Sequence, residues 1–203
     1  MTPGSRRLFL AVTPPAGVVE HLDRALAPLR AEPGAPRWTP AARWHLTLLF
    51  LGAVPAHRVA GLLAATGPAV AGTGPAALRL AGAGRFGSRR RPQVFWVGVA
   101  GDDAAVSALA GRLAGAARGL GLPVEDRPFR AHLTVGRWRP GRPADGDLPA
   151  RLAGYRGPDW PVTEVQLVES HLGPEPRYEP LASWPVASSA GARMPCSDPG
   201  NGA

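Results

Sequence analysis

The tripeptide His-x-Thr occurs twice in this chain, and each copy lies inside an apolar run. The first run covers residues 44–51 (WHLTLLFL), and the second covers residues 129–136 (FRAHLTVG). Runs of this length and composition are typical of buried β-strands. Because side chains two positions apart share one face of a strand, each motif places an imidazole beside a hydroxyl group.

The two motifs also predict how the chain is divided. A helical pattern precedes the motif strand in each half, which indicates a duplicated α+β lobe. We expect a bilobal fold in which two antiparallel sheets face a central cleft across a pseudo-two-fold axis, with helices outside. The cleft would then hold two proton-transfer groups and two hydroxyl donors, an arrangement that suits a phosphate ester.

Local patterns predict the individual elements. Apolar positions at three- and four-residue steps predict helices that begin after Thr13, near Val59 and after Asp102-Asp103, with the hydroxyl of Thr13 and the aspartates as caps. Residues 140–158 are rich in Pro, Gly and Asp and predict a long loop with one helical turn. Strands are expected at residues 7–12, 43–52, 77–86, 94–99, 131–137, 162–172 and 181–186.

Length and charge limit the possibilities further. A chain of 203 residues is long enough for one compact core, so we expect a single domain over residues 1–187 and a disordered tail over residues 188–203. The 23 basic residues are all Arg, and the formal net charge of +8 favours an anionic partner. Arginines gather in two places: Arg85, Arg89, Arg90 and Arg91, and, around the second motif, Arg127, Arg130, Arg137, Arg139 and Arg142.

Other sequence features bear on the cellular setting. Cys196 is the single cysteine, which rules out an internal disulfide and favours a reducing compartment. The apolar stretch after Arg6-Arg7 is too short for an export signal, and nothing approaches the roughly 18 apolar residues of a membrane span. We therefore expect a cytoplasmic monomer that does not bind a membrane.

Three stretches together resemble the 2H phosphoesterases, and within them the LigT-like RNA 2',3'-cyclic phosphodiesterases. They are residues 7–12 (RLFLAV), 44–52 (WHLTLLFLG) and 128–137 (PFRAHLTVGR), with weaker support from residues 84–87 and 168–170. The chain departs from the family pattern at Ala131, where Pro is common, and at Glu175-Pro176, where a Gly-rich turn is common. These departures concern loop shape and leave the motif residues intact.

The resemblance implies a metal-independent enzyme without a cofactor that hydrolyses 2',3'-cyclic phosphate ends of RNA to 2'-phosphates. It also gives Arg137 the position of a phosphate contact. From the chemistry of the residues, we assign His45 as the proton donor and His132 as the proton acceptor. Thr47 and Thr134 would hydrogen-bond the non-bridging phosphate oxygens. The same two groups could also join a 2',3'-cyclic end to a 5'-hydroxyl, which would be 2'-5' RNA ligation.

Further contacts and other functions remain open at this stage. Phe129 and Arg130 are candidate contacts to a base or to RNA, because aromatic stacking is common in RNA recognition. The same fold could act on another cyclic phosphate or on a 2'-5' oligonucleotide, or it could bind RNA ends without catalysis. A metalloenzyme is disfavoured because no third His or carboxylate lies at ligand spacing near either motif.

Overall fold

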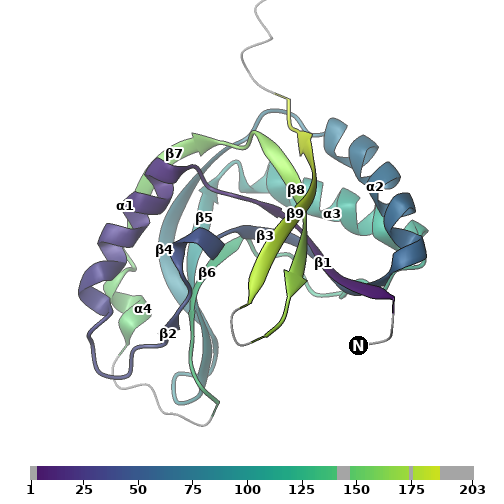
Figure 1. The fold of residues 1–203 in the computed structure, drawn as a ribbon. Coiled ribbons are helices and arrows are strands. Elements are labelled where there is room, and N and C mark those ends of the chain that lie inside the picture. Colours follow the sequence, from purple (N-terminus) through teal and green to yellow (C-terminus); the bar gives the residue numbers. More distant parts are fainter. Residues whose placement is uncertain (1–3, 141–146, 174–175, 188–203) are drawn as a thin grey trace, which may run out of the picture.

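The computed structural model describes residues 4–140, 147–173 and 176–187, and it shows an α+β fold built on one curled antiparallel sheet (Figure 1). The expected tail, Arg142 and Glu175 lie outside these residues. The elements in chain order are β1 (Ser5–Val12), α1 (Ala16–Leu26), β2 (Arg37–Trp38), β3 (Leu46–Pro55), α2 (Ala56–Ala71), β4 (Ala77–Gly87), β5 (Pro92–Gly101), α3 (Asp103–Gly119), β6 (His132–Arg137), α4 (Leu148–Arg151), β7 (Arg156–Pro161), β8 (Glu164–His171) and β9 (Arg177–Pro185).

The two halves of the sheet meet at its centre. The strand order is β7-β4-β5-β6-β3-β1-β8-β9, and the short strand β2 pairs with β6. The register joins β3 and β6 through one residue pair, Leu46 and Leu133. The α+β bilobal architecture is thus confirmed, with one refinement: the two expected sheets are joined edge to edge at the motifs into one continuous sheet.

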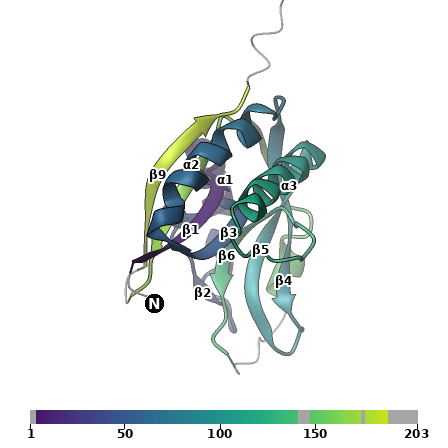
Figure 2. The same cartoon turned by 90° about the vertical axis from the view of Figure 1, so that its right-hand side faces the viewer.

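The helices cover the outer side of the curl in two groups (Figures 1 and 2). Helix α1 packs against β7 and α4 against β4, whereas α2 and α3 pack on each other and on β3, with α2 also reaching β9. The helix that precedes each motif strand therefore covers the opposite half of the sheet. The duplication expected from the sequence is interleaved for these two helices, whereas α2 packs on β3, the motif strand that it follows.

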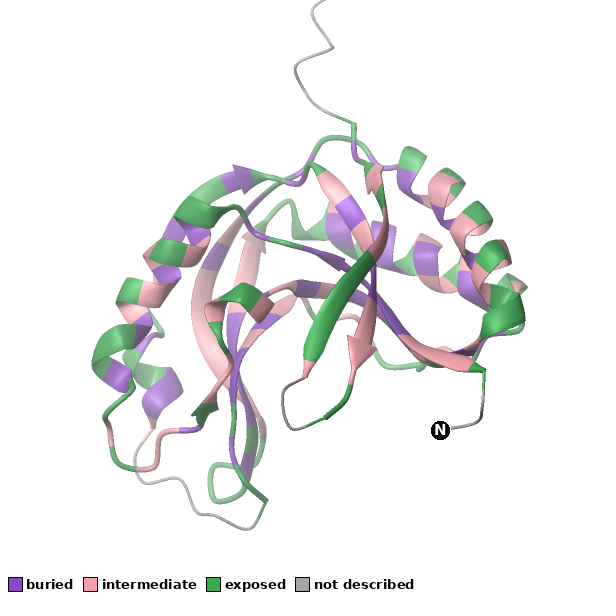
Figure 3. Cartoon of the chain, in the orientation of Figure 1, coloured by how far each residue is buried: buried purple, intermediate pink, exposed green. Residues whose placement is uncertain are grey.

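Apolar side chains on the central strands form the core. Leu8 and Leu10 of β1, Leu46 of β3, Phe95 of β5 and Leu133 of β6 are completely buried. Figure 3 shows this burial along the middle strands, while α1 and α2 alternate between buried and exposed residues and β9 is mostly exposed. The well-packed centre holds the motif strands in place, because a shift of either strand would expose these side chains or make them clash with their neighbours.

Three local expectations were wrong in detail. The Thr13 hydroxyl donates to the Gln166 side chain and does not cap α1, whose N-cap is Pro15. Asp102 is the N-cap residue of α3, as expected, but its carboxylate accepts a hydrogen bond from the Ala77 backbone N–H and makes no side-chain capping bond to the helix. The end of the expected loop at residues 140–158 is instead the beginning of strand β7, which pairs with β4.

The helices in the described part of the chain include none with the length and hydrophobicity needed to cross a membrane.

Candidate active site

The two motifs run in opposite directions where β3 pairs with β6, which gives them a crossed register at the centre of the sheet. Leu46 and Leu133, the middle residues of the motifs, are antiparallel partners. Continuing this register by one residue on each side places His45 opposite Thr134, and His132 opposite Thr47. The two histidines occupy diagonal positions, which in antiparallel pairs are typically about 7–8 Å apart. This spacing leaves room for a small group between the imidazoles.

Both imidazole rings are oriented by the same backbone contact. Nδ1 of His45 lies 2.8 Å from the carbonyl oxygen of Arg43, and Nδ1 of His132 lies 2.6 Å from that of Arg130. A carbonyl oxygen only accepts hydrogen bonds, so Nδ1 must carry the proton in each ring. In both histidines, Nε2 is then the ring nitrogen that can give or take a proton in the cleft.

Burial and nearby cations lower the pKa of both histidines. Desolvation is the main cause in each case, and the hydrogen bond to the backbone carbonyl opposes it. His45 also feels the charges of His132 and Arg137, and His132 feels those of Arg130 and Arg137. Both rings therefore favour the neutral form before an anion binds.

Aromatic rings surround each histidine, with different geometry on the two sides. The His45 ring stacks on Phe9 with centroids 4.7 Å apart and meets the edge of Tyr178 at 5.3 Å. The His132 ring meets Phe86 edge-on at 4.9 Å and lies 6.4 Å from Trp96. These contacts restrict the rotation of both rings, so that Nε2 stays directed for proton transfer.

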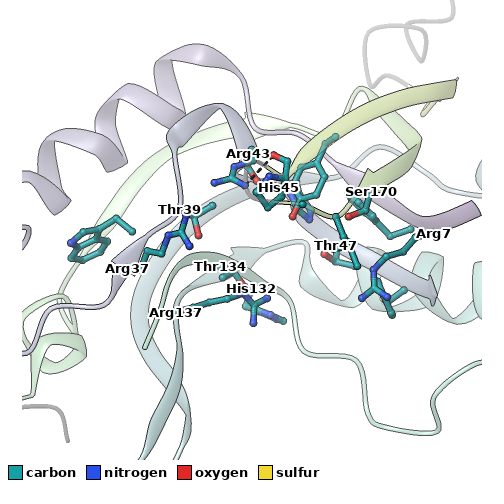
Figure 4. A pocket seen from close by; sticks show the side chains of 17 residues that line it. Arg7, Arg37, Thr39, Arg43, His45, Thr47, His132, Thr134, Arg137 and Ser170 are labelled. Carbon is teal, nitrogen blue, oxygen red and sulfur yellow. Dashed lines mark hydrogen bonds between the residues drawn. The ribbon is translucent and has the colours of Figure 1, made fainter. Parts of the chain in front are cut away.

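The motif residues line a cavity of about 500 Å³ (Figure 4). Four arginines share it, Arg7, Arg37, Arg43 and Arg137, and no carboxylate of the described residues lines it. Figure 4 shows Arg37 and Arg137 at one end and Arg7 at the other, with the motif side chains between them. The cavity is therefore a cationic cleft that favours an anionic ligand at its centre.

The rim of this cleft is unusually apolar. Phe50, Leu172 and Tyr178 are the large hydrophobic side chains that the described part of the chain leaves exposed, and all three line the cavity. The Arg7 guanidinium lies 4.7 Å from the centre of the Phe50 ring. Exposed aromatic rings beside cations are suited to a ligand that carries both a phosphate and a flat apolar group.

The structure brings five of the seven residues singled out from the sequence to the cavity: His45, Thr47, His132, Thr134 and Arg137. Phe129 packs against the hydrophobic core instead. Arg130 stacks over Trp96 at 4.3 Å, outside the cavity lining. The suggested contacts of Phe129 and Arg130 to a base or to RNA stay predictions.

Sequence reasoning missed several lining residues, and some carried a signal. Arg7 lies two positions before Phe9 in β1, so both share the cleft face of that strand. Arg43 precedes His45 by two positions, as Arg130 precedes His132, so the full repeat is Arg-x-His-x-Thr. Tyr178 had no comparable signal, because only the pairing of β9 with β8 brings it to His45.

Among the described residues, one group of side chains outside the motifs has the composition of a metal site. Glu169, His171 and Glu179 present ligand atoms within 4.8 Å of one another on β8 and β9. Glu169 is already paired with Arg6 at 2.5 Å, and His171 contacts Glu179 at 3.1 Å. These contacts explain the group as a network of paired side chains near the edge of the sheet. The Arg6 guanidinium lowers the pKa of Glu169.

Fold and site together place the chain in the LigT-like class of bilobal α+β proteins. The structure superposes with a TM-score of 0.75 on E. coli LigT complexed with 3'-AMP, at 29% identity, covering 91% of this chain and 99% of that one. It superposes equally well, at 0.75, on the protein TT0787 of Thermus thermophilus, at 29% identity and with 90% and 99% coverage.

Sequence comparison gives the family. The family model of the 2'-5' RNA ligase superfamily matches residues 14–174, and the chain belongs to this superfamily. It is 33% identical over 161 residues to an RNA 2',3'-cyclic phosphodiesterase of Geobacillus stearothermophilus, covering 77% of this chain but 49% of that protein, so the chain spans about half of that relative. It is 32% identical over 193 residues to one of Thermus thermophilus, covering 91% and 92%.

Proposed function

We propose that this protein hydrolyses 2',3'-cyclic phosphate ends of RNA to 2'-phosphates by acid–base catalysis between His45 and His132. The observation that carries the proposal is the crossed register of the two motifs. It sets two imidazoles with free Nε2 atoms diagonally across one cationic cavity, each beside the hydroxyl of the other motif. Proton transfer to and from a single phosphate requires this kind of pairing.

The reaction would proceed by in-line attack of water on phosphorus. Nε2 of His132 takes a proton from the water while its oxygen forms the new bond to phosphorus. The bond from phosphorus to the 3'-oxygen breaks, and Nε2 of His45 donates its proton to that oxygen. The products are a 2'-phosphate and a free 3'-hydroxyl, and a second proton exchange with water resets the pair.

The lowered pKa values fit this cycle once the substrate is bound. Before the substrate binds, both imidazoles favour the neutral form, which is the form that a general base needs. A phosphodiester anion within hydrogen-bonding reach raises the pKa of the imidazole that it contacts. The substrate thereby helps to supply the imidazolium that acts as the general acid.

Hydroxyl and guanidinium groups would stabilise the charge that develops on the phosphate. Thr47 and Thr134 line the cavity beside the opposite histidine, where they can donate to the two non-bridging oxygens. Arg137 also lines the cavity and is close enough to lower the pKa of both histidines. No step in this scheme requires a metal ion.

The comparisons support this substrate class. Both relatives described above bear the name RNA 2',3'-cyclic phosphodiesterase, and the superfamily is named for 2'-5' RNA ligation. If a 5'-hydroxyl takes the place of water, its oxygen forms the new bond to phosphorus, the bond to the 3'-oxygen breaks, and the same two histidines join the strands through a 2'-5' linkage. We therefore propose 2'-5' ligation as a slow second activity of the same site.

The test is hydrolysis of a short RNA that ends in a 2',3'-cyclic phosphate, with a metal chelator present. We expect turnover and a product whose phosphate is on the 2'-oxygen, identified by chromatography against 2'- and 3'-phosphate standards. A 3'-phosphate product would contradict the assigned direction of ring opening.

Other outcomes would assign the cleft differently. No turnover, with tight binding of the same RNA, would make the protein an RNA-end binding module. No turnover or binding, but hydrolysis of a different cyclic phosphate or of a 2'-5' dinucleotide, would move the activity within the same fold. Turnover that disappears with chelator would point to a metal-dependent reaction.

A further inference from the structure

The tip of the β4–β5 hairpin carries a cluster of arginines that the catalytic proposal does not use. Gly87 of β4 pairs with Pro92 of β5, so the connecting loop consists of residues 88–91 (SRRR), called here the arginine loop. Its three arginines, Arg89, Arg90 and Arg91, are all exposed. Such a concentration of positive charge at a hairpin tip costs free energy through mutual repulsion unless an anion offsets it.

The loop has a defined shape. The Arg91 backbone N–H donates to both the carbonyl oxygen and the side-chain Oγ of Ser88, at 3.2 and 3.0 Å. Gly87 has a φ of +89°, and a Cβ there would lie 2.5 Å from the Arg91 carbonyl oxygen, so the turn requires glycine. The arginine side chains therefore project from a fixed turn.

A neighbouring ion pair leaves the loop arginines largely free. Arg85 binds both carboxylate oxygens of Asp147 at 2.8 Å and holds the pKa of that carboxyl below its ordinary value. Arg89 approaches the same carboxylate only at 4.0 Å. Within the residues that the structure describes, Arg90 and Arg91 form no ion pair.

The arginine loop is continuous with the cationic end of the cleft. Val94 of β5 pairs with Arg137 of β6, which pairs with Arg37 of β2, and both arginines line the cavity. Beyond this pair, the Trp138 backbone N–H donates to the Gln93 carbonyl oxygen, so the exposed Arg139 follows toward the loop. In Figure 1 the hairpin tip and the end of β6 project from the same end of the molecule.

The distance between the cleft and the arginine loop suits a nucleic-acid strand. Arg91 lies three residues before Val94, the partner of Arg137, which is about 10 Å at the usual rise of roughly 3.3 Å per residue. A chain of phosphates leading away from the cavity would pass Arg137 first, then Arg139 and then the loop. Arginine side chains spaced along such a path can each contact a phosphate of a single strand.

We propose that the arginine loop binds the phosphate backbone of the RNA strand whose cyclic-phosphate end occupies the cleft. The inference rests on the proposed function, since it uses the cavity as the site of the terminal phosphate. It adds that the preferred substrate is an RNA strand several nucleotides long, held at its end by the motifs and farther along by the loop. A mononucleotide would not reach the loop.

The test variant replaces all three loop arginines by serine (Arg89→Ser, Arg90→Ser and Arg91→Ser). A matched control makes the same number of changes at exposed arginines on α1, α3 and β7: Arg24→Ser, Arg118→Ser and Arg156→Ser. Both variants lose the same net charge, so a difference in their RNA binding reflects where the arginines lie and not the loss of charge. Their melting temperatures are compared with that of the intact protein.

Binding is measured by fluorescence anisotropy with a labelled decanucleotide RNA that ends in a 2'-phosphate, which needs no catalytic activity. We expect the loop variant to bind at least about tenfold more weakly at low salt, and the control variant to bind nearly as the intact protein does. The slope of log affinity against log salt should fall by about 2, since each single-strand phosphate contact contributes roughly 0.7.

Turnover completes the test. For the loop variant, kcat/KM on a nucleoside 2',3'-cyclic phosphate should stay within twofold, while kcat/KM on the decanucleotide cyclic phosphate falls with the affinity. Unchanged RNA binding, an equal loss in the control variant, or a parallel loss on the mononucleotide would each overturn the proposal. Lack of turnover by the intact protein would contradict the proposed function, and the anisotropy result would still decide on the loop.

Discussion

The surroundings of His45 and of His132 differ although the local sequence is repeated. Both histidines follow an arginine by two residues and donate from Nδ1 to its carbonyl oxygen. His45 lies face to face with Phe9 and against the edge of Tyr178. The Arg43 guanidinium donates a hydrogen bond to the Pro176 carbonyl oxygen at 3.2 Å. His45 is thus enclosed by aromatic rings.

His132 has a more cationic setting. Its ring meets Phe86 and Trp96 at their edges, and Arg130 lies over the Trp96 ring. The charges of Arg130 and Arg137 both lower the pKa of His132. A neighbouring cation makes an imidazole a weaker proton acceptor but keeps it neutral over a wider pH range.

The comparison shows that a repeated motif fixes ring orientation while its environment sets proton affinity. Orientation comes from a contact between residues two apart, so both copies share it. The cations beside the two rings differ: His132 and Arg137 lower the pKa of His45, whereas Arg130 and Arg137 lower that of His132. Both environments lower the pKa of the ring, and the variants described below test which histidine acts as the base.

Removing either imidazole should have the largest effect. We expect His45→Ala and His132→Ala each to lower kcat on an RNA cyclic phosphate by about 10²–10⁴-fold, the range for loss of a general acid or base. Combining them should add little, because one missing partner already stops proton transfer. Steady-state kinetics would check this, and a variant that retains near-full activity would break the acid–base pair.

Replacing the threonines should have the next largest effect, equal in the two halves if the cleft acts symmetrically on the phosphate. Thr47→Val and Thr134→Val keep the side-chain shape but remove the hydroxyl donor. We expect kcat to fall by about 10²-fold in each, with a smaller change in KM. A large loss in only one variant would show that one non-bridging oxygen carries most of the developing charge.

The leucines between the motif residues should affect stability and not chemistry. Leu46 and Leu133 are completely buried partners at the junction of the two halves. Leu46→Ala and Leu133→Ala should each lower the free energy of unfolding by about 2–5 kcal/mol, as measured by urea denaturation. Leu172→Ala, at a side chain that is 64% exposed, serves as the control and should change stability little.

The pH profile should separate the roles of the two histidines. Because both pKa values are lowered from about 6.5, kcat/KM should be bell-shaped with its maximum below pH 6.5. At lower pH the base gains a proton, and at higher pH the acid loses one. The apparent pKa values of the two limbs belong to the coupled pair of histidines and not to either ring alone.

The substitution Arg130→Gln should have the smallest effect on activity. It tests which histidine gives rise to each limb of the pH profile. Removing this charge raises the pKa of His132, so the acidic limb should move to higher pH by less than one unit if His132 is the base. Arg43→Gln is the matched change at the other motif and should leave that limb in place. Movement of the alkaline limb in Arg130→Gln would exchange the roles of the two histidines.

Much of the fold could be predicted because its elements follow from short patterns. Residues 7–12, 77–86 and 94–99 were expected as strands and lie in β1, β4 and β5. Errors arose where a short polar side chain had a distant partner, as when Thr13 donates to Gln166 instead of capping α1. Local capping rules do not foresee a partner supplied by another strand.

The candidate site shows the same division. Because motif periodicity depends only on chain geometry, it identified the four His and Thr side chains as neighbours within each motif. Tyr178 and Arg7 join the cleft through the pairing of β9 with β8 and of β1 with β3. Such long-range register depends on which apolar faces fit together, and no local pattern encodes it.

By itself, the sequence determined the chemical groups of the candidate site: two imidazoles, each with a hydroxyl two residues away. These relations are set by backbone geometry over a few residues. Only the tertiary structure decided that Leu46 meets Leu133, which crosses the motifs and opens one cleft between them. The physical reason is that burying both leucines selects one register among many, and that register brings the two motifs together.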